Sequence, residues 1–478
     1  MRKNRVFTAI VAAAALSLPA LAQQNPPAGA QTTMAQPTMA RELPPPPAAP
    51  RDFNIPTVVK FTLDNGLDVR LVQYGDVPKV SVGLFTRAGN EDETPSEVWL
   101  ADLTGSMMEQ GTATRTAEDV ALQAANMGGS VSVNVGVNQT TIRGDALSEN
   151  TTDMIRLIAD IAMNPKLPES ELPRLKGDLA RQLSIALSQP RQLATQKFMS
   201  ITYPNHPYGR LFPTPETLQS FTIQQVRDFY QNNFGADRSR IYVVGKFDPA
   251  AVEAAIRQSL GSWKRGPEAI RNPPTPFSKR AVYFIDRPGS VQSTIYMGLP
   301  TPDPSNPEYV ATQVMNSLLG GSFGSRITSN IREQKGYTYS PNSQFSNRLG
   351  SGNWVEVADV TTNVTGPAIK EILYEIDRLR KDPPTAEELR GIQNYLAGVF
   401  VLQNSSRGGI MGLLNFVDLY GLSEDYLRNY VRQVYAVSPQ QISQIAQKYI
   451  DPDKITVVIA GDLNAVREQL TPYGEINQ

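Results

Sequence analysis

Cysteine is absent from this chain of 478 residues, and histidine occurs once, at His206. These absences exclude disulfides, thiolate metal sites and cysteine nucleophiles, and they exclude any zinc site that needs two imidazoles. An excess of charge of one sign is also lacking, because 45 Lys and Arg balance 46 Asp and Glu to a net charge of −1. Such a chain carries no electrostatic footprint for nucleic acid or an anionic membrane. Its 40% hydrophobic residues are nevertheless enough to build real cores.

The N-terminus has the pattern of a signal peptide. Arg2, Lys3 and Arg5 precede an apolar run from Val6 to Leu21, and Ala20-Leu21-Ala22 is a small-x-small cleavage site. A membrane anchor is the alternative, but the run is short for a span of about 20 residues and contains Pro19. Residues 1–22 therefore predict export to the periplasm, which also suits a chain without cysteine.

The segment that follows, residues 23–50, is rich in proline and ends in the run Pro44 to Pro47 before Ala48-Ala49-Pro50. Proline at this density favours an extended, solvated chain over a packed core. The sequence predicts a disordered linker here.

Two later segments of the chain resemble each other. Residues 222–247 align without a gap on residues 438–463, with Gln224 matching Gln440 and Gly245 matching Gly461. Both begin with a hydroxyl residue that can cap a helix, and both lead into a β-branched strand that stops at glycine. The sequence therefore predicts a duplication.

The seam between the two copies is a proline-rich stretch. It divides the chain into an N-terminal domain of residues 51–266, an interdomain linker of residues 267–280 and a C-terminal domain of residues 281–470. In the first half Val131, Val133 and Val135 alternate as in a half-buried strand, and a helix carrying Ile155 and Ile158 follows.

In the second half Asn306-Pro307 predicts the start of a helix that carries Val310, Val314 and Leu318 on one face. Adjacent strands followed by runs of helices predict an α+β fold, in which each half is a mainly antiparallel sheet with helices packed on one face.

Three motifs in the sequence invite a chemical interpretation. Residues 320–324 match the serine-hydrolase pattern G-x-S-x-G, but a helix pattern precedes Ser322 and the single histidine lies in the other half, so a Gly-Ser loop is favoured. The run Glu91-Asp92-Glu93 offers clustered oxygens for a cation, yet such a run is more typical of a solvated loop. His206, between prolines, is interpreted as a surface or packed loop histidine rather than a lone base.

One helix-to-strand stretch, Ser325 to Tyr339, holds an arginine and a tyrosine on either side of its junction. Ile327 and Ile331 can face a core, and Gly336 suits the helix end. Arg332 and Tyr339 together can hold a peptide carbonyl or carboxylate and stabilise an oxyanion. Spacing alone leaves open whether the pair is functional or is a surface arginine beside a packed tyrosine.

Several segments, in their order, resemble a known family. They are residues 61–67 (FTLDNGL), Gly111-Thr112, residues 206–210 (HPYGR), residues 292–298 and residues 325–339. The chain is similar to the pitrilysin or insulinase-type zinc metallopeptidases, specifically the bacterial branch that resembles the mitochondrial processing peptidase. The resemblance covers nearly all of the mature chain and implies two homologous α+β domains that form half of a clamshell.

Active members of this family carry His-x-x-Glu-His on the first helix, followed by a distal glutamate. Alignment on Gly111-Thr112 places Asp102 and Ser106 at the histidine positions, Gly105 at the position of the general base and Gln182 at the distal glutamate. All four catalytic positions are therefore degenerate, and no metal is expected in this chain, because zinc prefers nitrogen ligands and glycine cannot move a proton.

The resemblance also implies a role for the second half. In the family's heterodimers the non-catalytic partner offers an arginine and a tyrosine seven residues apart, which Arg332 and Tyr339 match. The resemblance therefore predicts a non-catalytic subunit of a periplasmic heterodimeric zinc peptidase that cleaves unfolded or short peptides. Arg332 and Tyr339 would bind substrate, and a homologous partner bearing His-x-x-Glu-His would hold the zinc. The alternative is a non-enzymatic scaffold or assembly subunit of the same fold.

Overall fold

Five of the six strands follow the same order in the two halves of the chain, and only the outermost strands differ, since β1 opens the first half and pairs antiparallel whereas β12 ends the second half and pairs parallel. The computed structural model describes residues 56–269 and 272–478, so the predicted signal peptide and proline-rich linker lie outside the described residues. The sheets have the orders β1-β2-β6-β3-β5-β4 and β12-β7-β11-β8-β10-β9. In each sheet the third strand runs parallel to the second and antiparallel to the fourth. This shared topology is what a duplicated unit produces.

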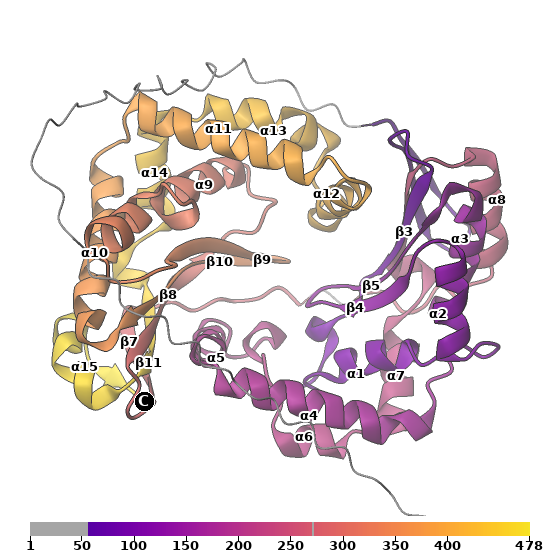
Figure 1. Ribbon diagram of the computed structural model, residues 1–478, viewed down its shortest axis with the longest axis horizontal. Helices are drawn as coiled ribbons and strands as arrows, with labels where there is room; N and C mark the ends of the chain where they lie inside the picture. Colours follow the sequence, from indigo (N-terminus) through magenta and orange to yellow (C-terminus); the bar gives the residue numbers. More distant parts are fainter. Residues whose placement is uncertain (1–55, 270–271) are drawn as a thin grey trace, which may run out of the picture. The chain divides into compact units, whose positions relative to one another are not determined.

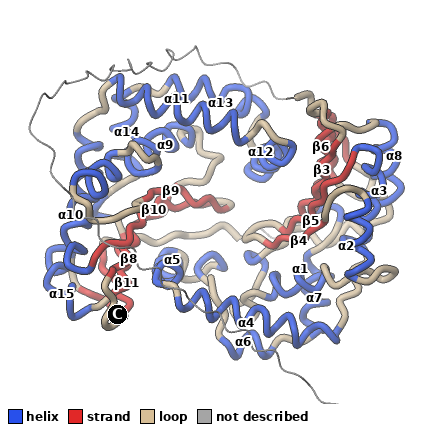
Figure 2. Tube along the Cα trace, viewed as in Figure 1, coloured by secondary structure: helices blue, strands red, loops and turns tan. Residues whose placement is uncertain are grey.

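The strands of the first sheet are β1 Val58–Thr62, β2 Asp68–Gln73, β3 Lys79–Thr86, β4 Val131–Val135, β5 Thr140–Leu147 and β6 Ser239–Gly245. Those of the second are β7 Ala281–Asp286, β8 Gln292–Thr301, β9 Asn342–Arg348, β10 Ser351–Thr361, β11 Thr456–Gly461 and β12 Ile476–Asn477. The two sheets stand out as separate groups of strands in Figure 2.

The helices are α1 Leu100–Met108, α2 Ala117–Asn126, α3 Thr151–Met163, α4 Leu172–Ser188, α5 Pro190–Thr202, α6 Pro215–Ser220, α7 Ile223–Asn233, α8 Pro249–Leu260, α9 Tyr309–Asn316, α10 Thr365–Lys381, α11 Ala386–Gln403, α12 Arg407–Tyr420, α13 Glu424–Ala436, α14 Pro439–Tyr449 and α15 Leu463–Leu470. Figure 1 shows them along the chain.

The aligned segments adopt the same structure in both halves. The Thr222 hydroxyl caps α7 by accepting from the N–H of Gln225, and the Ser438 hydroxyl caps α14 by accepting from the N–H of Gln441. Each helix leads into the third strand of its sheet, β6 or β11. The alignment of the two segments is thus confirmed at the level of caps, helices and strands.

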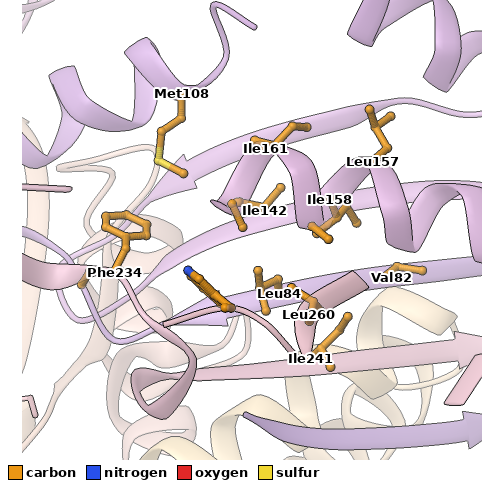
Figure 3. Packing of buried hydrophobic residues seen from close by; sticks show 14 of the residues in the cluster. Val82, Leu84, Met108, Ile142, Leu157, Ile158, Ile161, Phe234, Ile241 and Leu260 are labelled. Carbon is orange, nitrogen blue, oxygen red and sulfur yellow. The ribbon is translucent and has the colours of Figure 1, made fainter. Parts of the chain in front are cut away.

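The first sheet buries one face under helices of its own half. Figure 3 shows Leu157, Ile158 and Ile161 of α3 against Leu84 and Ile142 of the central strands. Ile158 and Leu84 are fully buried. Burial of each such side chain stabilises the fold by about 1.5–3 kcal/mol. The predicted strand at Val131 and the predicted helix at Ile155 both form.

In the second half α9 begins at Tyr309, two residues later than the sequence predicts. The Asn306 side chain accepts from the N–H of Glu308 and closes a local turn, so it does not cap the helix. The predicted apolar face is confirmed, because Val310, Val314 and Leu318 are all buried in the second core.

The sheets have a second buried face that sequence analysis missed. Helix α12, from the second half, packs against β3 and β6 of the first sheet, and α5, from the first half, packs against β8 and β11 of the second. Helices α5 and α12 follow the equivalent long helices α4 and α11, so the exchange is reciprocal (Figure 1).

Polar contacts anchor both exchanged helices. The Tyr242 hydroxyl of β6 donates to Asp418 of α12 at 2.7 Å, and the Tyr203 hydroxyl after α5 donates to Asn353 of β10 at 2.6 Å. The predicted α+β architecture is therefore confirmed, and each half also completes the packing of the other. No helix within the described residues is long and apolar enough to cross a membrane.

Candidate functional site

Arg332 lies between two exposed aromatic rings. Its guanidinium carbon is 4.4 Å from the centre of the Phe323 ring and 4.9 Å from the centre of the Tyr339 ring. Phe323 is 69% exposed and Tyr339 is 80% exposed, so both rings present much of their surface to solvent. Each cation–π contact contributes about 0.5–1 kcal/mol at an exposed site. The structure thus brings together Arg332, Tyr339 and Phe323, a residue that sequence analysis interpreted only as part of a Gly-Ser loop.

Irregular helix geometry places these three side chains. Phe323 lies in the loop between two π-helices, Ser317–Gly321 and Thr328–Gln334, and the second of them carries Arg332. Wide turns of this kind are uncommon and occur often at functional sites. Gly336 then takes a φ of +66°, which turns the chain out of the helix as the sequence predicts.

Contacts to the sheet and to neighbouring helices fix this arrangement. The Thr338 hydroxyl donates to the carbonyl of Asp359 at 2.7 Å, which sets the position of Tyr339 beside β10. Arg326 donates two hydrogen bonds to Glu388 of α11, at 2.7 and 3.0 Å, and is itself buried. A bidentate pair of this type holds its partners in one geometry. Arg332 and Tyr339 therefore belong to a segment that is fixed to β10 and α11.

The chemical groups of Arg332 and Tyr339 remain available. The Arg332 Nε pairs with Glu333 at 3.1 Å, and within the described part of the chain neither of its Nη groups nor the Tyr339 hydroxyl has a hydrogen-bonding partner. A guanidinium carries five N–H donors, and a phenol carries one O–H. Together they can donate to a carbonyl, a carboxylate or an oxyanion.

The buried carboxyl group of Glu356 packs closely against the loop at Gly320. A Cβ added to Gly320 would lie 2.7 Å from Glu356 Oε2 and 2.6 Å from Ser343 Oγ, so only glycine fits there. Complete burial raises the pKa of Glu356 well above its ordinary value. The Ser322 hydroxyl beside this loop is buried without a partner, and no strand precedes it, so the structure offers no nucleophile elbow.

The degenerate position Asp102 is tied to its neighbours on α1 and the preceding loop. The Asn90 amide donates to Asp102 Oδ2 at 2.7 Å and to Glu93 Oε1 at 3.1 Å, which joins the two carboxyls through one side chain. Burial raises the pKa of Asp102, and burial together with the Asp102 charge raises the pKa of Glu93 to about 8. The backbone N–H of Ala101 partly offsets the second shift.

Gly105 faces the edge strand at very close range. A Cβ built on Gly105 would lie 2.4 Å from Cγ2 of Val135 and 3.6 Å from Cγ1 of Val133. The Val135 side chain therefore occupies the space that a side chain at position 105 would enter. A glutamate does not fit there unless β4 or Val135 moves.

Ser106 and Gln182 do not complete a metal site with Asp102. Gln182 is exposed on α4, and neither its side chain nor that of Ser106 forms a hydrogen bond within the described residues. In residues 56–269 and 272–478 no three His, Cys, Asp or Glu side chains are grouped so that they could hold a metal ion. The residues at the four family positions do not fit zinc. They offer one carboxylate, which Asn90 holds, and no imidazole, and the Val135 side chain fills the space that a general base at position 105 would need.

The run Glu91-Asp92-Glu93 is not the solvated loop that the sequence favoured. Glu93 is 5% exposed, and the other two carboxylates have buried partners: Glu91 accepts from Asn138, and Asp92 pairs with Arg238 at 2.9 Å. The run can be buried because each carboxyl group has a hydrogen-bond donor in the folded protein, which the sequence alone could not reveal.

His206 is a packed loop residue, as one of the two interpretations held. Its Nδ1 accepts from the N–H of Tyr208 at 3.2 Å, so its Nε2 carries the proton and donates to the carbonyl of Asn272 at 2.8 Å. Burial lowers the pKa of His206, which favours this neutral form. Both ring nitrogens are thereby engaged in joining the loop to the interdomain segment.

Comparisons with family models and with known proteins point to one family. The model of the insulinase family, peptidase family M16, matches residues 70–216, and the model of the peptidase M16 inactive domain matches residues 220–396. Proteins named as uncharacterized zinc proteases are 24% identical in Rickettsia felis, over 80% of this chain and 90% of theirs. In Bacillus subtilis such a protein is 22% identical, over 84% and 98%.

Solved structures share the fold. A peptidase M16 inactive domain from Pseudomonas fluorescens superposes with a TM-score of 0.79 at 23% identity, covering 85% of this chain and 98% of its own. A protease from Helicobacter pylori gives the same TM-score at 18% identity, covering 85% of this chain and 100% of its own. Two consecutive family models and the two-sheet fold thus agree, and the chain belongs to peptidase family M16.

Proposed function

We propose that this chain is the non-catalytic subunit of a heterodimeric zinc metallopeptidase that cleaves unfolded or short peptides in the periplasm. One observation carries the proposal. The residues at the four positions that hold zinc and the general base in active family members do not form a zinc site here. In the same chain Arg332 and Tyr339 lie side by side, and they have hydrogen-bond donors without partners among the described residues. Free donors on an anchored segment are what a subunit that binds a peptide carbonyl or carboxylate would need.

The two side chains would act on different parts of the substrate. Arg332 would hold a peptide carbonyl or a C-terminal carboxylate through its free Nη groups, with charge-assisted hydrogen bonds. Tyr339 would donate to the oxyanion that develops when water attacks the scissile carbonyl. The zinc of the partner subunit would supply the activated water, so this chain would contribute positioning and charge stabilisation.

The partner is expected to be a homologue that bears His-x-x-Glu-His. It would also present an edge strand on which an extended peptide adds as a further strand, a common mode of peptide recognition. This chain would close the chamber and limit the size of the substrates that enter. The predicted signal peptide at residues 1–22 is the basis for placing the pair in the periplasm.

Affinity purification of the tagged mature chain from its native periplasm tests the proposal. Mass spectrometry should identify a partner of similar size with His-x-x-Glu-His, and metal analysis should find about one zinc per pair. Elution of the chain alone, or as a homodimer without zinc, would contradict the proposal and favour the scaffold function.

A further inference from the structure

A pocket of about 560 Å³ lies between α5 and the segment of residues 209–214. Both halves of the chain contribute apolar side chains to its walls. Val98, Leu193 and Phe212 come from the first half, and Ile285 comes from β7 of the second. Ligand pockets in proteins are concave and mostly apolar, with a few polar groups that fix the orientation of the ligand.

Hydrogen bonds and ring contacts hold one wall of the pocket in place. The indole N–H of Trp99 donates to the carbonyl of Leu211 at 3.0 Å, and its ring meets the Phe212 ring edge-on, with 6.0 Å between the ring centres. Nη2 of Arg210 donates to the carbonyl of Glu93 at 2.7 Å. The wall is therefore formed before any ligand arrives, which lowers the entropic cost of binding.

The charges in the pocket are of one sign. Lys197 and Arg210 line it, and no aspartate or glutamate is among the described residues that do so. Neither cation forms an ion pair within the described residues, and neither Nζ of Lys197 nor Nη1 of Arg210 has a hydrogen-bonding partner there. Burial lowers the pKa of Arg210, because its charge is poorly hydrated. An anion placed between the two would be attracted by both.

We propose that this pocket binds a carboxylate that is carried on an apolar group, an inference that goes beyond the proposed function. Lys197 and Arg210 donate charge-assisted hydrogen bonds to the carboxylate, and Leu193 and Phe212 contact the apolar group. The site is separate from the proposed substrate-binding pair. A free aromatic acid and the C-terminus of a peptide that ends in an apolar residue share this chemistry, and the experiment distinguishes these two sources.

The absence of cysteine makes the pocket easy to probe, because Ser200→Cys gives the chain a single thiol. Ser200 is exposed and lines the pocket, and its hydroxyl donates to the carbonyl of Lys197 at 2.8 Å. Ser405 is exposed outside the pocket, and its hydroxyl donates to the carbonyl of Leu402, also three residues earlier, at 2.7 Å. Ser405→Cys is therefore a matched control.

The experiment measures how fast N-ethylmaleimide, a neutral reagent, modifies the single thiol of each purified mature variant. The added compounds are 3-phenylpropionate, acetyl-glycyl-phenylalanine and the neutral amide of each. We expect at least one acid to slow the modification of Ser200→Cys, with half-maximal protection at about tenfold lower concentration than its amide requires. Modification of Ser405→Cys should not change. The acid that protects at the lower concentration identifies the source of the carboxylate.

Lys197→Gln in the Ser200→Cys chain should remove most of the preference for the acid. Lys264→Gln is the control substitution, because Lys264 also lies near a tyrosine ring, at 5.9 Å from the centre of Tyr230, but does not line the pocket. It should leave the preference unchanged.

Equal protection by acid and amide, protection by neither acid, or equal protection of the thiol at position 405 would overturn the inference. A preference for the acid that survives Lys197→Gln would overturn the role of that side chain. The comparison of acid with amide needs only Ser200→Cys, so it decides the matter even if Lys197→Gln does not fold. Zinc, partner and turnover play no part, so the outcome is independent of the proposed function.

Discussion

The guanidinium of Arg332 lies over the ring of Tyr339, with 4.9 Å between the guanidinium carbon and the ring centre. The two residues are seven positions apart, and Gly336, in a left-handed conformation, reverses the chain between them. Phe323 closes the other side of the guanidinium. The arginine is therefore positioned by two aromatic surfaces before any substrate arrives, which lowers the entropic cost of binding.

Tyr339→Phe should lower peptide turnover by the reconstituted pair by roughly ten- to a thousandfold, the scale of one lost oxyanion donor. The ring remains, so the contact with Arg332 and the assembly of the two subunits should be kept. Steady-state kinetics on a quenched-fluorescence peptide measures the effect. Tyr374→Phe is the control, because Tyr374 is also exposed, at 55%, but belongs to α10. Unchanged turnover in Tyr339→Phe would reject the assigned role.

Arg332→Lys should weaken substrate binding, with a rise in KM of about tenfold. Lysine keeps the charge but loses the planar fork that matches a carboxylate and stacks between Phe323 and Tyr339. The matched substitution is Arg257→Lys on α8, where an arginine also covers a ring, that of Phe61, and pairs with Glu253. If both variants change KM equally, the effect is not specific to the site.

Replacement of Asp102, Gly105, Ser106 and Gln182 by His, Glu, His and Glu should create zinc affinity, provided that Val135 is also changed to alanine. The Cγ2 of Val135 lies 2.4 Å from a Cβ at position 105, so the four-residue variant should be destabilised by about 1–3 kcal/mol and the fifth change should relieve this. Metal analysis after dialysis and urea unfolding measure the two effects. No bound zinc in the folded five-residue variant would argue against the assignment of these positions.

Glu93→Gln should stabilise the protein at alkaline pH and leave it nearly unchanged near pH 4. Burial raises the pKa of Glu93 from 4.5 to about 8, so the folded protein holds a proton that the unfolded chain releases above pH 4.5. The wild-type free energy of unfolding therefore falls between pH 4.5 and about 8, by an amount on the order of 5 kcal/mol from this group.

Urea unfolding at pH 4, 6, 8 and 9 measures the difference between Glu93→Gln and wild type. The glutamine keeps an oxygen that can accept from Asn90 and Ala101, as Glu93 does. A difference that does not grow with pH would show that Glu93 is ionised in the folded protein over this whole range.

Local patterns in the sequence predict the repeated unit well. The caps at Thr222 and Ser438, and the strands that end at Gly245 and Gly461, depend on neighbours a few residues away. The meeting of Arg332 and Tyr339 also depends on a short helix end, so their spacing was informative. Each of these features is determined by residues that are close together in the sequence.

Features that depend on distant residues could not be predicted. Helices α5 and α12 each pack on the sheet of the other half. The apolar periodicity of a helix predicts that one face is buried, but it does not say which sheet that face covers. The burial of Glu93 depends on Asn90 and on the backbone of α1, whereas three consecutive acidic residues usually lie in solvent. The role of Phe323 beside Arg332 follows from π-helix geometry, which leaves no simple periodic signal.

The most direct test separates the two proposed subunits and then recombines them. Zinc content and hydrolysis of an unfolded peptide are measured for this chain alone, for its co-purified partner alone and for the mixture. We predict that zinc remains with the partner, that only the mixture hydrolyses the peptide efficiently, and that Tyr339→Phe in this chain lowers that activity. Zinc binding or peptide hydrolysis by this chain alone, or a partner that is fully active without it, would contradict the account.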